Sequence, residues 1–207
     1  MNNENIIEFD TSGFECDEDG NVIGHNAQNV CDYDDDSYDS GEALAALPQP
    51  SEEQENIIKL VAENNVLVDS VAGCGKTTTV VHTSLRYPES KILLLMYNKR
   101  LKEETKKRIR ELGLKNVEVQ NFHSFFVRHY EGDSFTDVGL AQTVNRDNPP
   151  KTPFTFDLIV IDEAQDLKLI FYRSFCKIHK DNLFPNPRIM ILGDKFQNIY
   201  KFLGSDE

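Results

Sequence analysis

Short apolar runs alternate with amphipathic stretches along the chain after about residue 50. The apolar runs are typical of buried strands and lie at 66–70, 91–97, 117–120, 156–163 and 188–192. Helical spacing of apolar residues predicts a helix that begins at Ser51 and further helices at 77–86, 99–112, 122–130 and 167–179. Strands that alternate with helices predict an α/β fold, in which helices cover both faces of a parallel sheet.

The segment 131–154 interrupts this alternation. It contains Gly132, Gly139 and the pair Pro149-Pro150, which are typical of turns and loops. We therefore expect a loop or a small insertion between the third and fourth strands.

The first 48 residues differ from the rest in charge. Residues 1–50 hold 13 of the 35 Asp and Glu residues and none of the 22 Lys and Arg residues, so the formal net charge of −13 belongs to this segment. No periodic apolar face offsets the entropy cost of ordering it. We expect residues 1–48 to form a disordered acidic tail, which either favours solubility or competes with nucleic acid and recruits a basic partner.

Composition excludes several classes of protein. No apolar run is long enough to span a bilayer, so we expect no membrane partner, and the N-terminus lacks the basic and apolar parts of a signal peptide. The cysteines at 16, 31, 74 and 176 show neither metal-ligand spacing nor the density of a disulfide framework. These features predict a soluble intracellular protein whose folded domain spans residues 49–207.

A glycine-rich turn joins the first strand to the next helix. Unpaired N–H groups and the helix dipole at such a turn can hold a polyphosphate. Lys76 can reach the β- and γ-phosphates, and the Thr77 hydroxyl can ligate Mg²⁺. The turn departs from the usual pattern at Ser70, where the first glycine is expected, and a chance glycine-rich turn is the alternative. The nucleotide-binding residues that we expect here are Ser70, Val71, Ala72, Gly73, Cys74, Gly75, Lys76, Thr77 and Thr78.

Two adjacent carboxylates end the fourth strand. Ligands collect at the carboxyl ends of strands in open α/β sheets, so Asp162 and Glu163 should emerge beside the glycine-rich turn. Asp162 can then hold Mg²⁺, and Glu163 can orient and deprotonate an attacking water. The turn and the carboxylates together predict binding of ATP with Mg²⁺.

Six sequence blocks occur in the order seen in one family. The chain resembles the N-terminal ATP-binding domain of superfamily 1A DNA helicases, the UvrD/Rep-like group, over about residues 49–205. This resemblance implies a RecA-like P-loop fold. The blocks that carry it are Gln54, the turn 72–77, Tyr97-Asn98-Lys99, the block 121–125 (Asn-Phe-His-Ser-Phe), the block 162–166 (Asp-Glu-Ala-Gln-Asp) and the block 193–204.

The resemblance also implies residue roles. Gln54 would recognise adenine, although a plain capping-box glutamine is an alternative reading of this residue. Gln165 and Gln197 would lie by the γ-phosphate. The expected contacts with single-stranded DNA are Asn98, Lys99, Phe122, His123, Tyr200 and Phe202. For Phe122 and Phe125 core packing competes with this role, and we expect one of the two to be a core residue.

The chain departs from the family pattern in three places. Met96 stands where many members have a base-contacting Phe, which puts stacking there in doubt. The segment 131–154 is short beside the insertion of bacterial relatives. The sequence stops just after the last block, before the second RecA-like domain that carries the arginine fingers of this family. We expect a fragment or split half, or a free-standing protein that uses ATP as a signal.

The sequence therefore predicts the first motor domain of an ATP-dependent DNA helicase. Its 3′→5′ polarity is taken from the family alone, and its partners would be single-stranded DNA and a second RecA-like domain in cis or in trans. The alternative from another class is a non-hydrolysing, nucleotide-gated adaptor. A different P-loop NTPase would need a substrate lid and acceptor-binding residues, which the sequence does not offer.

Overall fold

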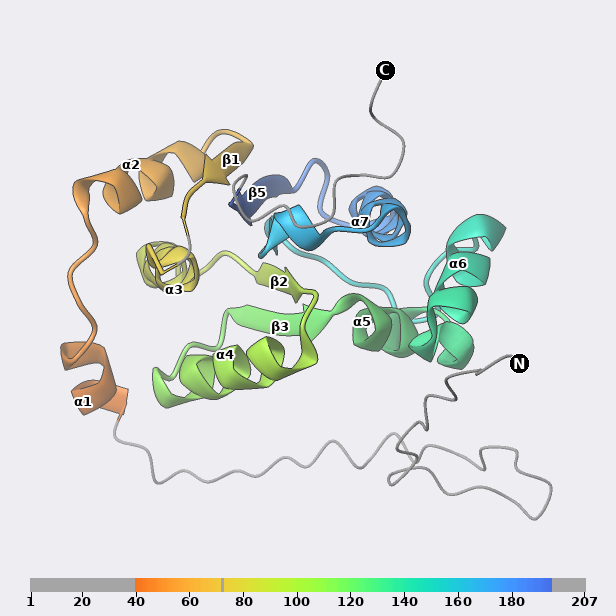
Figure 1. Cartoon of the computed structure of the whole chain (residues 1–207), viewed down its shortest axis with the longest axis horizontal. Coiled ribbons are helices and arrows are strands. Elements are labelled where there is room, and N and C mark those ends of the chain that lie inside the picture. Colours follow the sequence, from red (N-terminus) through yellow and green to blue (C-terminus); the bar gives the residue numbers. More distant parts are fainter. Residues whose placement is uncertain (1–39, 72, 195–207) are drawn as a thin grey trace, which may run out of the picture. The chain divides into compact units, whose positions relative to one another are not determined.

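A computed structural model describes residues 40–71 and 73–194 of the chain (Figure 1). Residues 1–39, Ala72 and residues 195–207 lie outside this description, and with them most of the predicted acidic tail. The expected roles of Ala72, Gln197, Tyr200 and Phe202 therefore stay predictions.

The described residues form a five-stranded parallel sheet, as the alternating pattern predicted. Its strands are β1 (Val66–Asp69), β2 (Ile92–Met96), β3 (Val117–Asn121), β4 (Leu158–Ile161) and β5 (Arg188–Gly193). The strand order is β1-β5-β4-β2-β3, and every neighbouring pair is parallel. All carboxyl ends therefore lie along one edge of the sheet, where the predicted site residues should meet.

Helices cover both faces of this sheet (Figure 1). Those on one face are α2 (Glu52–Val61), α3 (Lys76–Arg86) and α4 (Lys99–Glu111). Those on the other face are α5 (Phe122–His129), α6 (Asp137–Arg146) and α7 (Leu169–Asp181). Within the described ranges, no helix has the length and apolar character needed to cross a membrane.

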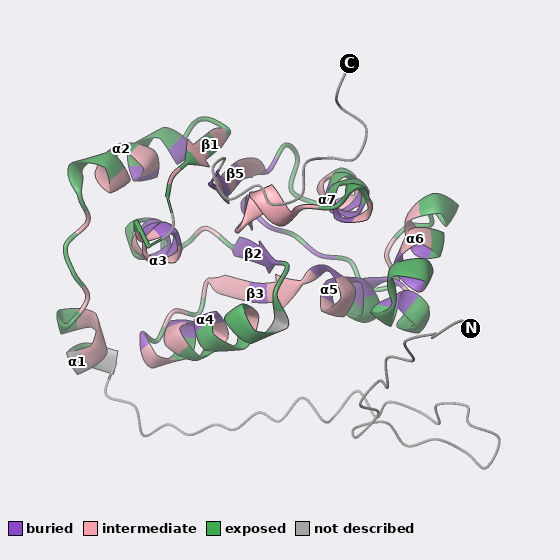
Figure 2. Ribbon diagram, viewed as in Figure 1, coloured by how far each residue is buried: buried purple, intermediate pink, exposed green. Residues whose placement is uncertain are grey.

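Continuous apolar runs form the middle of the sheet. All residues of β2 and β4 are buried, as expected for strands that are covered on both faces (Figure 2). Side chains alternate between the two faces of the sheet. Leu93 therefore packs in the apolar cluster between the sheet and α5, α6 and α7, which we call the α5–α7 cluster. Leu94 packs in the cluster between the sheet and α2, α3 and α4, which we call the α2–α4 cluster. This central pair of strands fixes the position of the carboxyl edge.

Regular structure begins earlier than the predicted tail boundary at residue 48. The helix α1 (Ser40–Ala45) lies within the segment that we expected to be disordered. Leu44 and Leu47 are partly buried against the α2–α4 cluster, and this burial favours an ordered conformation from Ser40 onwards.

The segment 131–154 contains two helices that the sequence pattern did not predict. A 3₁₀ helix η1 (Gly132–Phe135) leads into α6. Gly139 lies where an added Cβ would be 1.8 Å from the carbonyl oxygen of Asp133, so its role is close packing of α6 on η1. We had interpreted this glycine as a loop signal, whereas here it allows the helix to approach its neighbour.

Candidate nucleotide and nucleic-acid site

The glycine-rich turn and the end of β4 meet at the carboxyl edge of the sheet. The Thr77 hydroxyl donates a hydrogen bond to Asp162 Oδ2 at 3.3 Å, and Lys76 Nζ lies 3.7 Å from Glu163 Oε2. Four residues that the sequence predicted to share one triphosphate therefore contact one another as two pairs.

The turn has the backbone that an anion site requires. Gly73 has φ +79° and Gly75 has φ +87°, a left-handed conformation that strongly favours glycine. Gly75 is the N-cap of α3, and no side chain caps this helix. The first N–H groups of α3 are thus not satisfied by a side-chain cap, which suits a phosphate.

Lys76 is held inside the turn. Its side chain is only 6% exposed, and Nζ donates a long hydrogen bond of 3.5 Å to the Ser70 carbonyl oxygen. The Ser70 hydroxyl is buried, with no hydrogen-bond partner in the described part of the chain. An ammonium group in weak contacts beside an unpaired hydroxyl fits an oxygen-rich anionic ligand.

Asp162 is a buried carboxylate at the end of β4. Burial and the neighbouring Glu163 carboxylate raise the pKa of Asp162, while hydrogen bonds from the Glu163 N–H and the Thr77 hydroxyl oppose this rise. A carboxylate beside a hydroxyl offers the hard oxygen ligands that Mg²⁺ takes when it keeps several waters and also binds phosphates. No group of three His, Cys, Asp or Glu residues within the described ranges could hold a metal ion.

Glu163 adopts an unusual backbone conformation, with φ +53°. Such a conformation in a non-glycine residue is disfavoured and occurs often at functional sites. The side chain accepts a hydrogen bond of 2.6 Å from Gln165 Nε2, and Gln165 Oε1 accepts one of 3.0 Å from the Asp194 N–H. Gln165, in the 3₁₀ helix η2 (Ala164–Asp166), therefore links Glu163 to the end of β5.

Gln54 has the capping-box role that the sequence offered as one reading, and it also contacts the glycine-rich turn. It forms a capping box with Ser51, since its Oε1 accepts the Ser51 N–H at 3.0 Å and its N–H donates to the Ser51 hydroxyl at 3.2 Å. Its Nε2 also donates to the Gly75 carbonyl oxygen at 3.3 Å. Gln54 thus caps α2 and contacts the glycine-rich turn, and recognition of adenine stays a prediction.

Thr78, the last nucleotide-binding residue predicted for the turn, accepts a long hydrogen bond of 3.5 Å from Arg108 through its hydroxyl.

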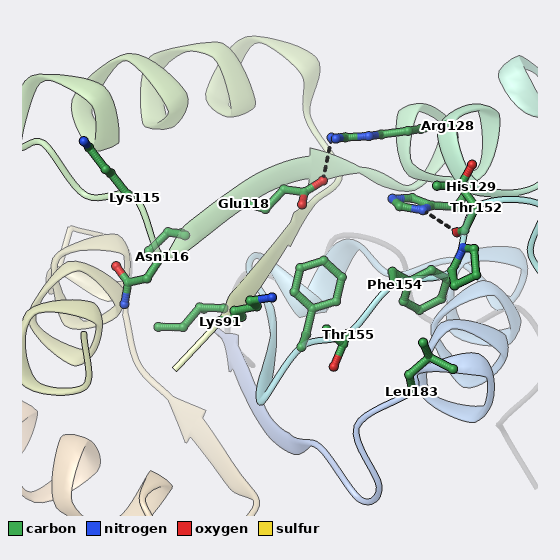
Figure 3. A pocket seen from close by; sticks show the side chains of 14 residues that line it. Lys91, Lys115, Asn116, Glu118, Arg128, His129, Thr152, Phe154, Thr155 and Leu183 are labelled. Carbon is green, nitrogen blue, oxygen red and sulfur yellow. Dashed lines mark hydrogen bonds and ion pairs between the residues drawn. The ribbon is translucent and has the colours of Figure 1, made fainter. Parts of the chain in front are cut away.

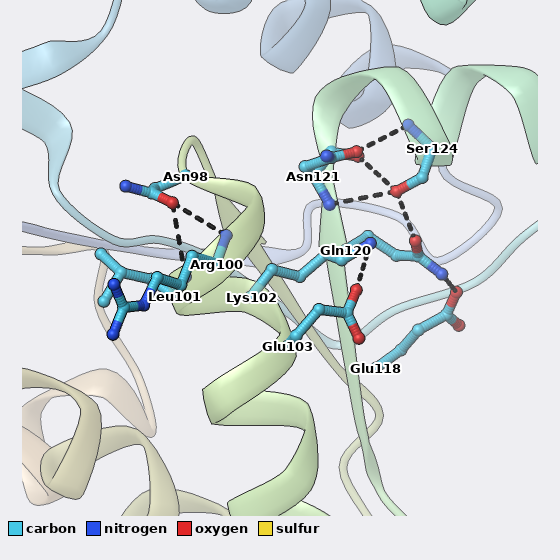
Figure 4. Close-up of polar contacts among 9 residues, drawn as sticks. All are labelled: Asn98, Arg100, Leu101, Lys102, Glu103, Glu118, Gln120, Asn121 and Ser124. Atoms are coloured by element: carbon cyan, nitrogen blue, oxygen red, sulfur yellow. Dashed lines mark hydrogen bonds and ion pairs between the residues drawn. The ribbon is translucent and has the colours of Figure 1, made fainter. Parts of the chain in front are cut away.

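The predicted DNA contacts divide into surface and core residues. Asn98 caps α4 through Oδ1, which accepts the N–H groups of Arg100 and Leu101 (Figure 4). Lys99 begins α4, and the His123 ring is hydrogen-bonded to Asp137. Phe122 is only 1% exposed and packs against Phe171. The prediction that Phe122 stacks on a DNA base is therefore wrong, because its ring is buried in the core.

Two helix caps fix the strand ends that bear these residues (Figure 4). Asn121 ends β3 and caps α5, where its Oδ1 accepts the Ser124 N–H at 2.7 Å and its own N–H donates to the Ser124 hydroxyl at 3.2 Å. Asn98 and Asn121 thus each mark the point where the chain leaves a strand and enters a helix.

We had expected one of the two residues Phe122 and Phe125 to be a core residue, and the structure buries both.

Sequence reasoning missed three residues beside this surface. Tyr97 is 41% exposed and lies edge-on to Phe171, with ring centroids 5.2 Å apart. Lys168 Nζ lies 5.8 Å from the centre of the Tyr97 ring. Tyr97 belongs to the family block 97–99, but the resemblance assigned DNA contacts only to Asn98 and Lys99 of that block. Lys168 and Phe171 lie outside all six blocks.

A second pocket lies at the opposite edge of the sheet, where β2 and β3 begin. It measures about 460 Å³, and its lining includes Lys91, Lys115 and His129 (Figure 3). His129 Nδ1 donates to the Thr152 carbonyl oxygen at 2.9 Å, and Nε2 is buried with no partner in the described part of the chain. Burial lowers the pKa of His129, so the ring is neutral near pH 7. None of the predicted site residues lines this pocket.

One protein family matches this chain. The AAA domain family matches residues 53–203, which include the glycine-rich turn and the end of β4. The chain belongs to the AAA domain family. This membership agrees with the resemblance to the ATP-binding domain of a superfamily 1 helicase, and the UvrD/Rep-like subfamily stays a prediction. Among the curated proteins, nothing matches this AAA domain.

Several solved structures are similar to this AAA domain. Bacteroides sp Pif1 in complex with ADP-AlF4 has 18% identity and a TM-score of 0.45, over 71% of this chain and 32% of that one. Bacteroides Pif1 bound to ssDNA has 19% identity and a TM-score of 0.44, over 72% and 33%. The Sulfolobus solfataricus SWI2/SNF2 ATPase core in complex with dsDNA has 11% identity and a TM-score of 0.47, over 74% and 35%.

The AAA domain thus covers about a third of each of these structures.

Proposed function

We propose that the chain is the first motor domain of an ATP-dependent superfamily 1 DNA helicase. It binds Mg-ATP and single-stranded DNA, and it couples ATP hydrolysis to 3′→5′ translocation when a second RecA-like domain completes it. The observation that carries this proposal is the meeting of Lys76 and Thr77 with Glu163 and Asp162 at the carboxyl edge of the sheet.

Nucleotide binding rearranges the polar contacts of the turn. Lys76 leaves the Ser70 carbonyl oxygen and the Glu163 carboxylate for the β- and γ-phosphates, which the N–H groups of the turn also hold. Thr77 and Asp162 would hold Mg²⁺, which neutralises charge on the phosphates when bound. The chain thus exchanges weak internal contacts for charge-assisted ones.

Hydrolysis depends on the carboxylate next to the metal site. Once Lys76 turns to the phosphates, Glu163 is free to orient and deprotonate an attacking water. Gln165 holds Glu163 and the N–H of Asp194 at the same time. A change at the γ-phosphate would therefore reach the end of β5, from which the predicted DNA-contact block 193–204 continues.

The DNA-binding surface lies along the same edge. Asn98 and His123 come from the ends of β2 and β3, and Lys99 follows Asn98. Tyr200 and Phe202 are proposed as further stacking residues, and residues 1–48 as a tail that attracts a basic partner. A second domain that supplies an arginine finger would raise the hydrolysis rate by about 10³–10⁵-fold.

A non-hydrolysing adaptor is the second candidate. One observation favours it: Lys76 and Gln165 both contact the same oxygen of the Glu163 carboxylate, Oε2. In this reading ATP binding alone repositions Gln165 and the end of β5.

ATP hydrolysis measured with and without single-stranded DNA separates these functions. The proposal predicts slow hydrolysis that DNA stimulates, no nucleotide binding by Lys76→Ala, and ATP binding without hydrolysis by Glu163→Gln. ATP binding with no hydrolysis under either condition would support the adaptor. Hydrolysis that is indifferent to DNA would support a different P-loop NTPase.

A further inference from the structure

The pocket at the edge of the sheet where β2 and β3 begin lies apart from the proposed motor site, and we call it the strand-start pocket. Its volume of about 460 Å³ is within the range of pockets that hold small molecules. Its lining shares no residue with the proposed nucleotide site or with the expected DNA contacts. A molecule held there would therefore be a further ligand, distinct from ATP and DNA.

A buried histidine in this pocket lacks one hydrogen bond. His129 is only 5% exposed, and its Nδ1 donates to the Thr152 carbonyl oxygen at 2.9 Å. Since a carbonyl oxygen only accepts, Nδ1 carries the proton of the neutral ring and Nε2 is an acceptor. Nε2 has no partner among the described residues, and Figure 3 shows it pointing into the pocket. An O–H or N–H group of a ligand would satisfy this acceptor.

The same pocket carries unpaired positive charge. Arg128 is already paired with Glu118 at 2.9 Å. Lys91 and Lys115 also line the pocket, and neither side chain forms an ion pair within the described ranges. Figure 3 shows the Lys91 ammonium group pointing into the pocket and that of Lys115 pointing away from it. Lys91 therefore offers a charge and three N–H donors to an anionic group.

Apolar side chains form much of the remaining wall. Phe154 and Phe156 line the pocket with their ring centroids 6.1 Å apart, and Pro153 and Leu183 line it as well. Leu183 is 67% exposed, so an apolar ligand would cover surface that now faces water. A flat ring suits this wall, because it can pack edge-on or offset against the two phenylalanine rings.

We propose that the strand-start pocket binds a small aromatic acid that carries a hydroxyl group. The acid group pairs with Lys91, the ring packs against Phe154 and Phe156, and the hydroxyl donates a hydrogen bond to His129 Nε2. Each part of the ligand thus matches one group that the described part of the chain leaves without a partner or exposes to water. The site is independent of ATP hydrolysis and of DNA binding.

Three related probes test these contacts without any change to the protein. The first, para-hydroxyphenylacetate, has the ring, the acid group and the hydroxyl. Phenylacetate lacks the hydroxyl, and para-hydroxyphenylacetamide lacks the negative charge. We expect para-hydroxyphenylacetate to bind about 2- to 10-fold more tightly than either of the other two, because each of them loses one polar contact.

The experiment is an NMR titration of the full, isotope-labelled chain with each probe near neutral pH. The His129 Nε2 resonance should move with para-hydroxyphenylacetate and not with phenylacetate, because only the hydroxyl donates to this nitrogen. Lys91→Met should weaken the binding of both acids by about 2- to 5-fold, and this loss should shrink as salt rises. The control Lys107→Met removes a 70% exposed lysine of α4 outside the pocket and should bind like the wild type.

Two results would overturn the inference. One is equal affinity for the three probes, or no binding of any of them, and the other is displacement of para-hydroxyphenylacetate by Mg-ATP, which would mean that the probe occupies the nucleotide site. A chain that shows the His129 response but binds neither Mg-ATP nor single-stranded DNA would refute the proposed function and leave this inference standing.

Discussion

At the scale of single residues, two glycines of the same turn should respond differently to a methyl group. An added Cβ on Gly75 would lie 2.8 Å from Gln54 Nε2, whereas one on Gly73 would have nothing within 4 Å. Both residues have positive φ, so each Ala variant should cost about 1–2 kcal/mol from the backbone alone. The Gln54 amide is the end of a flexible side chain, so it can move away, but it then loses its hydrogen bond to the Gly75 carbonyl oxygen. We predict that Gly75→Ala loses slightly more stability and more nucleotide affinity than Gly73→Ala.

Thermal unfolding and nucleotide titration of the two variants measure this difference. In the Gln54→Ala background, which lacks the capping box of α2 and the amide beside the turn, Gly75→Ala should cost no more stability than Gly73→Ala. Equal losses for the two single variants would show that Gln54 does not lie against the turn.

His129 should make stability depend on pH. Burial lowers the pKa of this histidine in the folded chain, so the unfolded chain, with a pKa near about 6.5, binds the proton more readily. Stability is therefore fully present above about pH 6.5 and falls as the pH drops below that value. His129→Asn, whose amide can still donate to the Thr152 carbonyl oxygen, should flatten this slope between pH 7 and pH 5.

Urea unfolding at several pH values measures the slope. The control is His179→Asn, which changes a histidine of α7 outside the pocket that His129 lines. It should keep the pH dependence of stability of the wild type. A His129→Asn protein with the same slope as the wild type would contradict the assignment to His129.

The placement of the site residues was predictable where a motif fixes both the residue type and its neighbours in space. Lys76, Thr77, Asp162 and Glu163 meet as the sequence indicated, because parallel strands bring their carboxyl ends to one edge. The left-handed backbone of Glu163 had no sequence signal, since it depends on how the chain leaves β4. The burial of Phe122 had no local sequence signal either, because it depends on packing against Phe171 of α7, which is distant in the sequence.

At the scale of elements, a buried lysine joins α6 to α7. Lys177 Nζ donates to Asp181 Oδ2 at 2.9 Å, to Asp147 Oδ1 at 3.2 Å and to the Asn148 carbonyl oxygen at 2.7 Å. Its side chain is 3% exposed, and the Tyr130 hydroxyl also donates to Asp181. We predict that Lys177→Met destabilises the fold by about 3–5 kcal/mol, because the largely buried Asp181 carboxylate then keeps only the Tyr130 hydroxyl and loses its counter-charge.

Chemical denaturation of Lys177→Met and Lys180→Met provides the comparison. Lys180 pairs with the same Asp147 but is 62% exposed, so its loss should cost much less stability than the loss of Lys177. Similar losses for the two variants would contradict the role of burial in this network.

The elements themselves were predictable where apolar periodicity is strong, and less so where packing overrides local signals. All five strands lie within or close to the expected runs, because each run is apolar enough to be buried between two layers of helices. The helix α6 was missed because Gly139 and the following prolines are loop signals, while contacts with η1 stabilise it. In particular, the buried Thr143 hydroxyl is hydrogen-bonded to the Ser134 hydroxyl at 2.8 Å.

At the scale of the whole molecule, ligand binding should appear as added stability. Mg-ATP at about 100 times its Kd should stabilise the fold by about 2.7 kcal/mol, which raises Tm by several degrees. Chelation of the metal should remove most of this shift, because the phosphates then lose the cation that Asp162 and Thr77 would hold. Differential scanning fluorimetry with and without EDTA measures both quantities, and an equal shift in the two conditions would contradict the metal site.

The most direct test of the account is calorimetric titration of Mg-ATP into the wild type and Lys76→Ala. Lys91→Ala, a change of an exposed lysine at the opposite edge of the sheet, is the matched control. We predict that the wild type and Lys91→Ala bind alike, and that Lys76→Ala shows no measurable Mg-ATP binding while its thermal unfolding stays cooperative. Equal Mg-ATP affinity in the folded Lys76→Ala protein would contradict the claim that this turn and the end of β4 form one triphosphate site.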